Sequence, residues 1–211
     1  IIFTTDNGCS PEADFEQLAT RGHDPSYHFR GHKADIYEGG HRVPFIVRWP
    51  QQVKAGEVSD QIVCTTDLFA TLADILEAEV KDDMAEDSFS FLDALGVPSD
   101  APRRDAIVHH SINGSFALRK GDWKTIFCPG SGGWSAPRPN AEGIEDLPGV
   151  QLYNLISDAG EQDNLQDQAP EIVEAHRELL TNIVKNGRST PGTPQKNDGP
   201  ETWPQLNWMN E

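Results

Sequence analysis

The chain has 211 residues, of which 36% are hydrophobic, and its formal net charge is −17. This length and hydrophobic share allow one or two folded domains with a real core. The strongly negative charge argues against a nucleic-acid partner, and no apolar run approaches the roughly 18 residues that a transmembrane helix requires.

The first predicted element is a strand over residues 1–5, which are β-branched or aromatic without alternation, as in a strand buried on both faces. Asp6, Asn7 and Gly8 follow, a composition typical of a tight turn at the carboxyl edge of a strand. Ligands bind at that edge in open α/β sheets. The side-chain oxygens of Asp6 and Asn7 are hard ligands that suit Ca²⁺ or Mg²⁺. An ordinary Asx turn is the alternative.

Residues 21–48 form a basic island in this acidic chain, with only three acidic residues among nine basic or histidine residues: Arg21, His23, His28, Arg30, His32, Lys33, His41, Arg42 and Arg48. A protein that binds a compact oxyanion needs such a local concentration of cations. A solvated loop without a ligand is the alternative. Gly39-Gly40 allows a sharp turn, and residues 43–47 predict a second strand.

Cap-forming residues at 65–67 precede apolar residues at helical spacing, which predicts a helix over 68–76 that covers the sheet. Residues 79–105 are acidic and rich in turn formers, and therefore predict a surface connection that ends near Asp105. We expect a domain boundary there.

Four short strands with turn signals follow, at residues 106–110, 115–119, 123–127 and 150–153, and they predict an antiparallel sheet. Pro170 begins an amphipathic helix that ends at Gly187, and His176 on its apolar stripe is interpreted as a packed core residue. Residues 189–211 lack periodicity, which predicts either a strap across the surface or a disordered tail. Trp203 and Trp208 favour the strap.

Two features of this second segment are candidate substrate contacts. His109 and His110 end a strand, and Trp134 follows the glycine-rich residues 130–133. An indole ring can stack on a sugar or aryl ring, and histidine can hydrogen-bond a hydroxyl or sulfate group. The alternative for Trp134 is that it fills a gap between two parts of the fold.

Three motifs in order carry a resemblance to a known family: Asp6-Asn7-Gly8, then Gly31-His32-Lys33 with Glu38-Gly39-Gly40-His41-Arg42-Val43-Pro44, and Leu152-Tyr153-Asn154-Leu155 with Asp158-Ala159-Gly160-Glu161. The chain resembles the formylglycine-dependent sulfatases of the alkaline-phosphatase superfamily, from residue 1 to about residue 192. The resemblance implies an α/β chain with three parts. Residues 1–105 would end an alkaline-phosphatase-like α/β sandwich domain. Residues 106–188 would form a small α+β subdomain, a four-stranded antiparallel sheet with a C-terminal helix, and residues 189–211 an irregular tail.

The resemblance also implies roles for matching residues. Asp6 and Asn7 would be two ligands of one divalent cation, Ca²⁺ in most of the family, with Mg²⁺ possible. Lys33 would donate to a sulfate oxygen and stabilise negative charge on the leaving oxygen. His32 is a weaker candidate for the same substrate group, and structural hydrogen bonding is its simpler role.

The family's nucleophile, a formylglycine made from cysteine in a Cys-x-Pro-x-Arg motif, is not found in these residues. Cys9 is followed by Ser10 and Pro11, but Ala13 stands where the motif requires arginine, and Cys64 and Cys128 fit no better. We therefore expect a C-terminal portion of an enzyme whose nucleophile and remaining metal ligands come from an N-terminal half, and expect it to be inactive alone. The three cysteines leave the redox compartment open.

The predicted function is hydrolysis of aryl or carbohydrate sulfates, with a sulfated small molecule or glycan as substrate. The family places such enzymes in the periplasm or outside the cell. Two alternatives stay open: hydrolysis of phosphate or phosphonate esters within the same superfamily, and a non-catalytic module that binds oxyanions. The residue at the nucleophile position would separate the two enzymatic functions.

Overall fold

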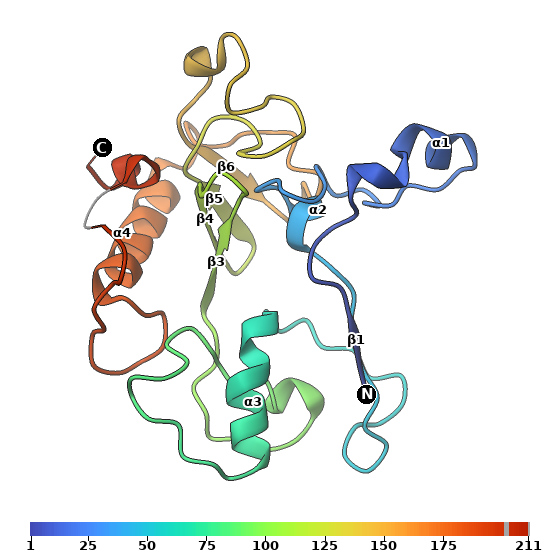
Figure 1. The fold of residues 1–211 in the computed structure, drawn as a ribbon, viewed down its shortest axis with the longest axis vertical. Coiled ribbons are helices and arrows are strands. Elements are labelled where there is room, and N and C mark those ends of the chain that lie inside the picture. The colour runs from blue at the N-terminus through green and yellow to red at the C-terminus, as the bar shows by residue number, and fades with distance from the viewer. Residues whose placement is uncertain (201–202, 211) are drawn as a thin grey trace.

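The computed structural model describes residues 1–200 and 203–210. Its strands and α-helices, in chain order, are β1 (Ile2–Thr4), α1 (Phe15–Thr20), α2 (Glu38–His41), β2 (Phe45–Val47), α3 (Leu68–Ile75), β3 (Ala106–His110), β4 (Phe116–Lys120), β5 (Trp123–Ile126), β6 (Gln151–Asn154) and α4 (Pro170–Asn186). Five short 3-10 helices complete it: η1 (Pro11–Ala13), η2 (Thr65–Asp67), η3 (Asp93–Leu95), η4 (Ile144–Asp146) and η5 (Pro204–Asn210). Figure 1 shows their arrangement.

The centre of the molecule is the four-stranded antiparallel sheet in the order β3-β4-β5-β6, which confirms the predicted subdomain sheet (Figure 1). Each strand alternates its side chains between two faces. One face packs on α4 and η5 through a core cluster formed by Phe116, Leu118, Phe127, Val150, Leu152, Val173, Leu180, Leu206 and Trp208. The predicted helix from Pro170 to Gly187 is confirmed, because Gly187 caps α4 at φ 63°.

Two further predictions concern residues that pack on this same face of the sheet. His176 is 4% exposed, and its Nδ1 lies 2.8 Å from Thr125 Oγ1 on β5, so it is a packed core residue. Leu206 and Trp208 are buried, and the Trp208 ring stacks on Phe127, so η5 is a strap. Residues 201, 202 and 211 of the predicted tail lie outside the described residues.

The opposite face of the sheet is covered by α2 and the segment before it (Figure 1). Its core consists of Ile36, Tyr37, Ala117, Ile126, Cys128, Tyr153 and Leu155. Ile36 and Tyr37 are both fully buried, which fastens the basic segment to the sheet. The predicted segments 1–105 and 106–188 are therefore in direct contact, and the boundary between them stays a prediction.

The first strand differs from its prediction. β1 pairs with β2 alone, in antiparallel register, and Ile2 and Phe3 are 43% and 58% exposed. The prediction that this strand is buried on both faces is therefore wrong, because none of the described residues forms a layer over β1.

α3 begins where it was predicted, but it does not cover the sheet. Its apolar stripe remains open, with Phe69, Leu72 and Leu76 exposed by 49%, 51% and 73%. The side chain of Asp67 does not cap α3. Its carboxylate accepts the backbone N–H groups of Cys64 and Phe89 and pairs with Arg104 instead. The exposed stripe is a surface that a further layer of protein would cover.

The connection over residues 79–105 lies at the surface, as predicted, with buried anchors at Phe89, Phe91 and Leu92. Arg188 clamps its start by donating to the backbone and side-chain oxygens of Asp82, each at 2.9 Å. Among the described residues, no helix has both the length and the apolar character needed to cross a bilayer.

Candidate active site

The turn formed by Asp6, Asn7 and Gly8 lies directly on α2. The backbone N–H of Gly8 donates to the carbonyl oxygen of Gly40 at 2.9 Å. A Cβ atom on Gly8 would lie only 1.8 Å from the carbonyl oxygen of Gly39. Glycine is required at position 8 because the two backbones meet without room for a side chain.

Lys33 lies on a loop, residues 31–35, that packs on the same turn. Its backbone N–H donates to the carbonyl oxygen of Cys9 at 3.0 Å. Gly31 opens the loop at φ +77°, a conformation that favours glycine. The structure therefore brings the predicted metal ligands and the predicted sulfate-binding lysine onto adjoining loops.

Asp35, which sequence reasoning missed, joins loop 31–35 to the loop that carries Trp134. One carboxylate oxygen accepts the backbone N–H of His32 at 2.9 Å. The other accepts the backbone N–H groups of Trp134 and Ser135 at 2.7 and 3.0 Å. Asp35 is 3% exposed, so these bonds form in a low-dielectric setting where they hold the loops firmly. The available signal in the sequence was an acid, Asp35, close to the basic residues His32 and Lys33.

A groove of about 740 Å³ opens beside the turn and is lined by Thr5, Asp6, Asn7, Gly8, Cys9, Pro25, Ser26, Tyr27, Phe29, Gly39, Arg42, Val43 and Pro44. Asp6 is exposed and Asn7 is half-buried at its rim. Ca²⁺ takes six to eight oxygen ligands, about twice or more what this turn's side chains offer. The donor chemistry fits calcium, but the groove alone would supply only part of a calcium shell, because Asp6 is the one carboxylate among the lining residues.

The predicted histidines divide between different surroundings. His32 Nδ1 lies 3.0 Å from the carbonyl oxygen of Lys33, so the ring is held within loop 31–35. His109 and His110 are neighbours on β3 and therefore face opposite sides of the sheet. His110 packs on Phe116, on the α4 side, whereas His109 packs on His41 of α2. Asp35 thus joins His32 and Trp134 through their backbone N–H groups, whereas the two adjacent histidines lie on opposite faces of the sheet.

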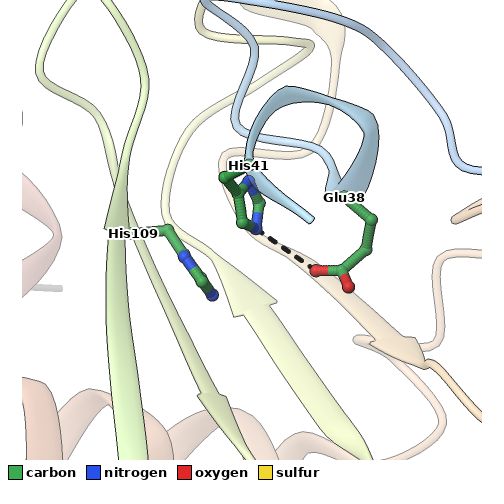
Figure 2. A group of neighbouring side chains, drawn as sticks. All are labelled: Glu38, His41 and His109. Carbon is green, nitrogen blue, oxygen red and sulfur yellow. Dashed lines mark ion pairs between the residues drawn. The ribbon is translucent and has the colours of Figure 1, made fainter. Parts of the chain in front are cut away.

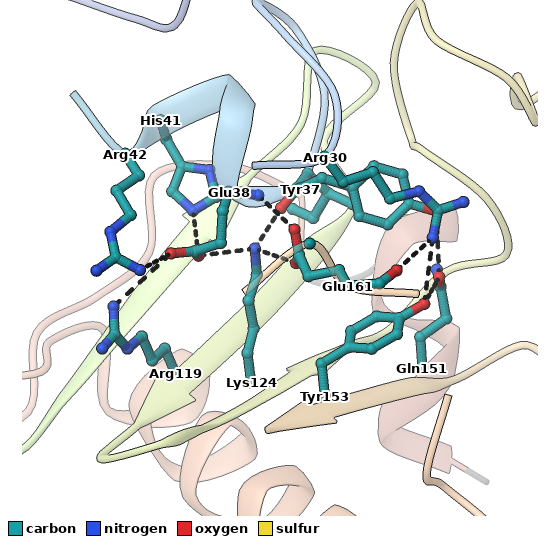
Figure 3. A network of polar contacts seen from close by, with 12 residues as sticks. Arg30, Tyr37, Glu38, His41, Arg42, Arg119, Lys124, Gln151, Tyr153 and Glu161 are labelled. Carbon is teal, nitrogen blue, oxygen red and sulfur yellow. Dashed lines mark hydrogen bonds and ion pairs between the residues drawn. The ribbon is translucent and has the colours of Figure 1, made fainter. Parts of the chain in front are cut away.

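Behind the candidate site lies a buried ionic network that joins α2 to the sheet (Figure 3). Lys124 on β5 is fully buried, and its Nζ lies 3.1 Å from Glu38 Oε1 and 2.9 Å from Glu161 Oε1. Glu161 Oε2 in turn accepts the backbone N–H of Glu38 at 2.7 Å. The second and third sequence motifs therefore meet in space, with Lys124 between their carboxylates.

The network sets the protonation of both glutamates. Burial alone would raise the pKa of Glu38, but Lys124 and His41 beside it hold that pKa well below its ordinary value. Burial, with Glu38 nearby, raises the pKa of Glu161 against the opposing effect of Lys124. The two carboxylates thus share one ammonium group, whose charge lowers the pKa of both while burial opposes it.

Hydrogen bonds extend the network along β6. Arg30 donates to the carbonyl oxygen of Glu161 at 2.8 Å and lies over the ring of Tyr37, 3.9 Å from its centroid. The hydroxyl groups of Tyr37 and Tyr153 both donate to Gln151 Oε1, at 3.1 and 2.8 Å. Burial raises the pKa of Tyr153 to about 12, so it remains a neutral donor.

A family model and similar curated proteins point to the same family. The family model described as Sulfatase matches residues 1–78, the part that holds both the Asp6 turn and Lys33. An N-acetylgalactosamine-6-O-sulfatase of Bacteroides thetaiotaomicron is 35% identical over 87% of this chain. The chain belongs to the sulfatase family.

Another curated relative and a solved structure also match most of the chain. An N-acetylgalactosamine-6-sulfatase of Sus scrofa is 27% identical over 93% of it. A solved structure also matches, with a TM-score of 0.70 and 34% sequence identity. It is described in connection with the metabolism of multiple glycosaminoglycans by Bacteroides thetaiotaomicron, and the match covers 87% of this chain and 38% of that one. This sulfatase chain spans 36% and 39% of the length of the two curated relatives. The predicted fold class, a mixed α/β chain with an antiparallel sheet and a C-terminal helix, is confirmed.

Proposed function

We propose that this chain supplies the calcium- and sulfate-binding side of a sulfuric ester hydrolase that acts on carbohydrate sulfates. The observation that carries the proposal is the packing of the Lys33 loop and of α2 on the segment of the Asp6 turn, through the bonds from Lys33 to Cys9 and from Gly8 to Gly40. Oxygen ligands for a cation and an ammonium group that suits an oxyanion are thereby held on adjoining loops. The N-acetylgalactosamine-6-O-sulfatase relative supports a sulfated amino-sugar glycan as the substrate class.

Each site residue has a defined part in this proposal. Asp6 and Asn7 hold Ca²⁺, or Mg²⁺ in its place, and the metal when bound polarises the sulfate ester. Lys33 donates to a sulfate oxygen and stabilises the negative charge that develops on the leaving oxygen. The nucleophile is the family's formylglycine, in sequence that these 211 residues do not include, since none of their cysteines has the Cys-x-Pro-x-Arg context.

The substrate's sugar would contact residues near loop 31–35. Trp134 is 37% exposed and its backbone is fixed by Asp35, so its ring is a preorganised stacking surface. His32 offers a ring whose Nδ1 is already engaged, which leaves Nε2 for a substrate oxygen. His110 is a more distant candidate on the other face of the sheet. For His109 the packing on His41 favours a different role, argued below.

The rest of a sulfatase would cover the open apolar surfaces. β1 and β2 expose Ile2, Phe3 and Ile46, and α3 exposes Phe69 and Leu72. Side chains of this kind form a layer interface in α/β domains. We propose that an N-terminal half of the same enzyme packs there and completes the metal shell, and that the enzyme works in the periplasm or outside the cell, as its family does.

The experiment uses a polypeptide of the relatives' length that contains these 211 residues, produced with a formylglycine-generating enzyme. It is given an N-acetylgalactosamine 6-sulfate glycan, an aryl sulfate and an aryl phosphate, each with Ca²⁺ or with a chelator. The proposal predicts calcium-dependent sulfate release that exceeds phosphate release. Faster phosphate release would favour the phosphoesterase alternative, and binding of sulfate without turnover would favour the oxyanion-binding module.

The 211-residue chain alone is the matched control. We expect it to hydrolyse no sulfate ester above background, because it holds positioning groups without a nucleophile. Turnover by the isolated chain, together with an aldehyde mass change at Cys9, would place the nucleophile at Cys9 and overturn this part of the proposal.

A further inference from the structure

Glu38, His41 and His109 form a compact cluster between α2 and β3 (Figure 2). The rings of His41 and His109 lie 3.8 Å apart between centroids, at an interplanar angle of 38°. Glu38 Oε1 lies 3.3 Å from His41 Nε2, one helical turn along α2. One ligand atom from each of the three residues lies within 4.8 Å of the other two, which is the spacing of ligands around a single ion.

Ring nitrogens of His41 and His109 are buried and lack hydrogen-bond partners among the described residues. Neither nitrogen of His41 nor Nε2 of His109 makes a hydrogen bond of acceptable geometry with any described residue. A buried polar atom without a partner lowers stability, and such atoms are rare in folded proteins. A single ion would satisfy one nitrogen of His41 together with Nε2 of His109, so two of these three atoms indicate a shared ligand.

The histidines are in the protonation state that a metal requires. Burial, and then the charge of Lys124, lowers the pKa of His41 to about 4. Burial, and then His41, also lowers the pKa of His109 well below its ordinary value. Both rings are therefore neutral at pH 7 and keep lone pairs for coordination, so a metal would not have to displace protons.

We propose that Glu38, His41 and His109 bind one divalent transition-metal ion of the zinc type, which ties α2 to the edge strand β3. Two imidazole nitrogens and one carboxylate oxygen are a donor set that zinc prefers, whereas calcium takes oxygen ligands alone. The site is separate in residues and in chemistry from the calcium turn at Asp6 and Asn7. It would act as a cross-link between two segments distant in sequence.

The cations around Glu38 set the limits of this site. Lys124 Nζ lies 3.1 Å from Glu38 Oε1, but it is also bound by Glu161 at 2.9 Å and by the carbonyl oxygen of Ile36 at 2.8 Å. Its charge is therefore balanced by a second carboxylate, and Oε1 can be shared with a metal.

Two arginines face the other carboxylate oxygen. Arg42 and Arg119 lie 3.3 and 3.7 Å from Glu38 Oε2, and their side chains are 43% and 21% exposed. Solvent and salt screen these charges in part. We expect the metal affinity to be lower than that of a closed structural zinc site and to increase with ionic strength.

The test measures zinc bound by the 211-residue chain in the presence of excess Ca²⁺, which removes competition from oxygen-only sites. Wild-type chain should retain about one zinc per molecule after gel filtration, and Co²⁺ in its place should give the visible absorption of a nitrogen-ligated ion. His109→Ala and His41→Met should each weaken binding at least about tenfold, since even changes beyond the ligands cost 10–100-fold. His110→Ala, the neighbour on the opposite face, should bind as wild type does.

Three results would overturn the site: no retained zinc in the wild-type chain, zinc retained equally after both His41→Met and His109→Ala, or equal loss in His110→Ala. Near-ultraviolet circular dichroism of each variant checks that its tertiary structure is intact. Should His109→Ala fail to fold, His41→Met and the wild-type Co²⁺ spectrum decide the question. None of these readouts depends on sulfatase activity, so the site and the proposed function can fail independently.

Discussion

Glu161 accepts the backbone N–H of Glu38 at 2.7 Å, across 123 positions of the chain. Through this bond and the shared Lys124, the sheet subdomain fixes the start of α2. α2 in turn carries Gly39 and Gly40, on which the Asp6 turn rests. The geometry of the Asp6 turn therefore depends on residues far from it in sequence.

Lys124→Met should lower the free energy of unfolding by about 3–5 kcal/mol, because it leaves two buried carboxylates without their cation. Urea denaturation of the 211-residue chain measures this. Lys120→Met is the matched control, since Lys120 lies on the same sheet with a 46% exposed side chain, and it should cost less than about 1 kcal/mol. Equal effects of the two substitutions would contradict the importance of the buried network.

His176 should make the chain less stable in mild acid. Burial lowers its pKa to about 4, from an ordinary value of 6.5. A lowered folded-state pKa means that the stabilising contribution is complete above pH 6.5 and is lost as the pH falls towards 4. His176→Gln should remove up to about 3 kcal/mol of the stability loss across that window. The exposed His23→Gln variant should keep the wild-type slope, and an unchanged slope in His176→Gln would contradict the assignment.

Gly8→Ala should disturb the Asp6 turn, which is the proposed metal site. The added Cβ would meet the carbonyl oxygen of Gly39 at 1.8 Å, and the backbone must move to relieve the contact. We expect a loss of about 1–3 kcal/mol in unfolding free energy, as in other overpacked sites, together with weaker calcium binding. Gly149→Ala, where a Cβ meets nothing within 4 Å, is the control. Calorimetric titration with Ca²⁺ checks both variants, and wild-type affinity in Gly8→Ala would contradict the packing argument.

Lys33→Ala, in a polypeptide of the relatives' length, should lower kcat/KM for a sulfate ester by about 10²–10³, the range for one preorganised electrostatic donor. Lys54→Ala removes a lysine whose side chain is 86% exposed and should leave the kinetics unchanged. Values within about threefold of wild type in Lys33→Ala would return this residue to the solvated-loop alternative.

Much of the fold followed from local patterns. Alternating strands with Asn113-Gly114 and Gly121 between them predicted the sheet, and Pro170 with Gly187 predicted α4 to within one residue. These elements are set by neighbouring residues, so sequence periodicity finds them. The burial of β1 and the covering role of α3 were predicted wrongly, because burial depends on packing with residues distant in sequence, which local patterns do not encode.

The network around the candidate site could not be predicted in the same way. Asp35 and Trp134 meet across 99 positions, and Lys124 and Glu38 across 86. No local pattern encodes such contacts, and an acidic residue within a basic island or a lysine within a strand is usually a solvated side chain. The resemblance found the motif ends of the network, at Glu38 and Glu161, but not the lysine that joins them.

The most direct test of the central claim is calcium-dependent release of sulfate from an N-acetylgalactosamine 6-sulfate glycan by the polypeptide of the relatives' length, compared between wild type and Asp6→Ala. Removing a charged ligand from the turn costs both coordination and charge neutralisation. We predict that Asp6→Ala abolishes turnover and weakens calcium binding, while Asp60→Ala in the exposed loop does neither. Wild-type turnover and calcium affinity in Asp6→Ala would contradict the claim that this turn is the metal site.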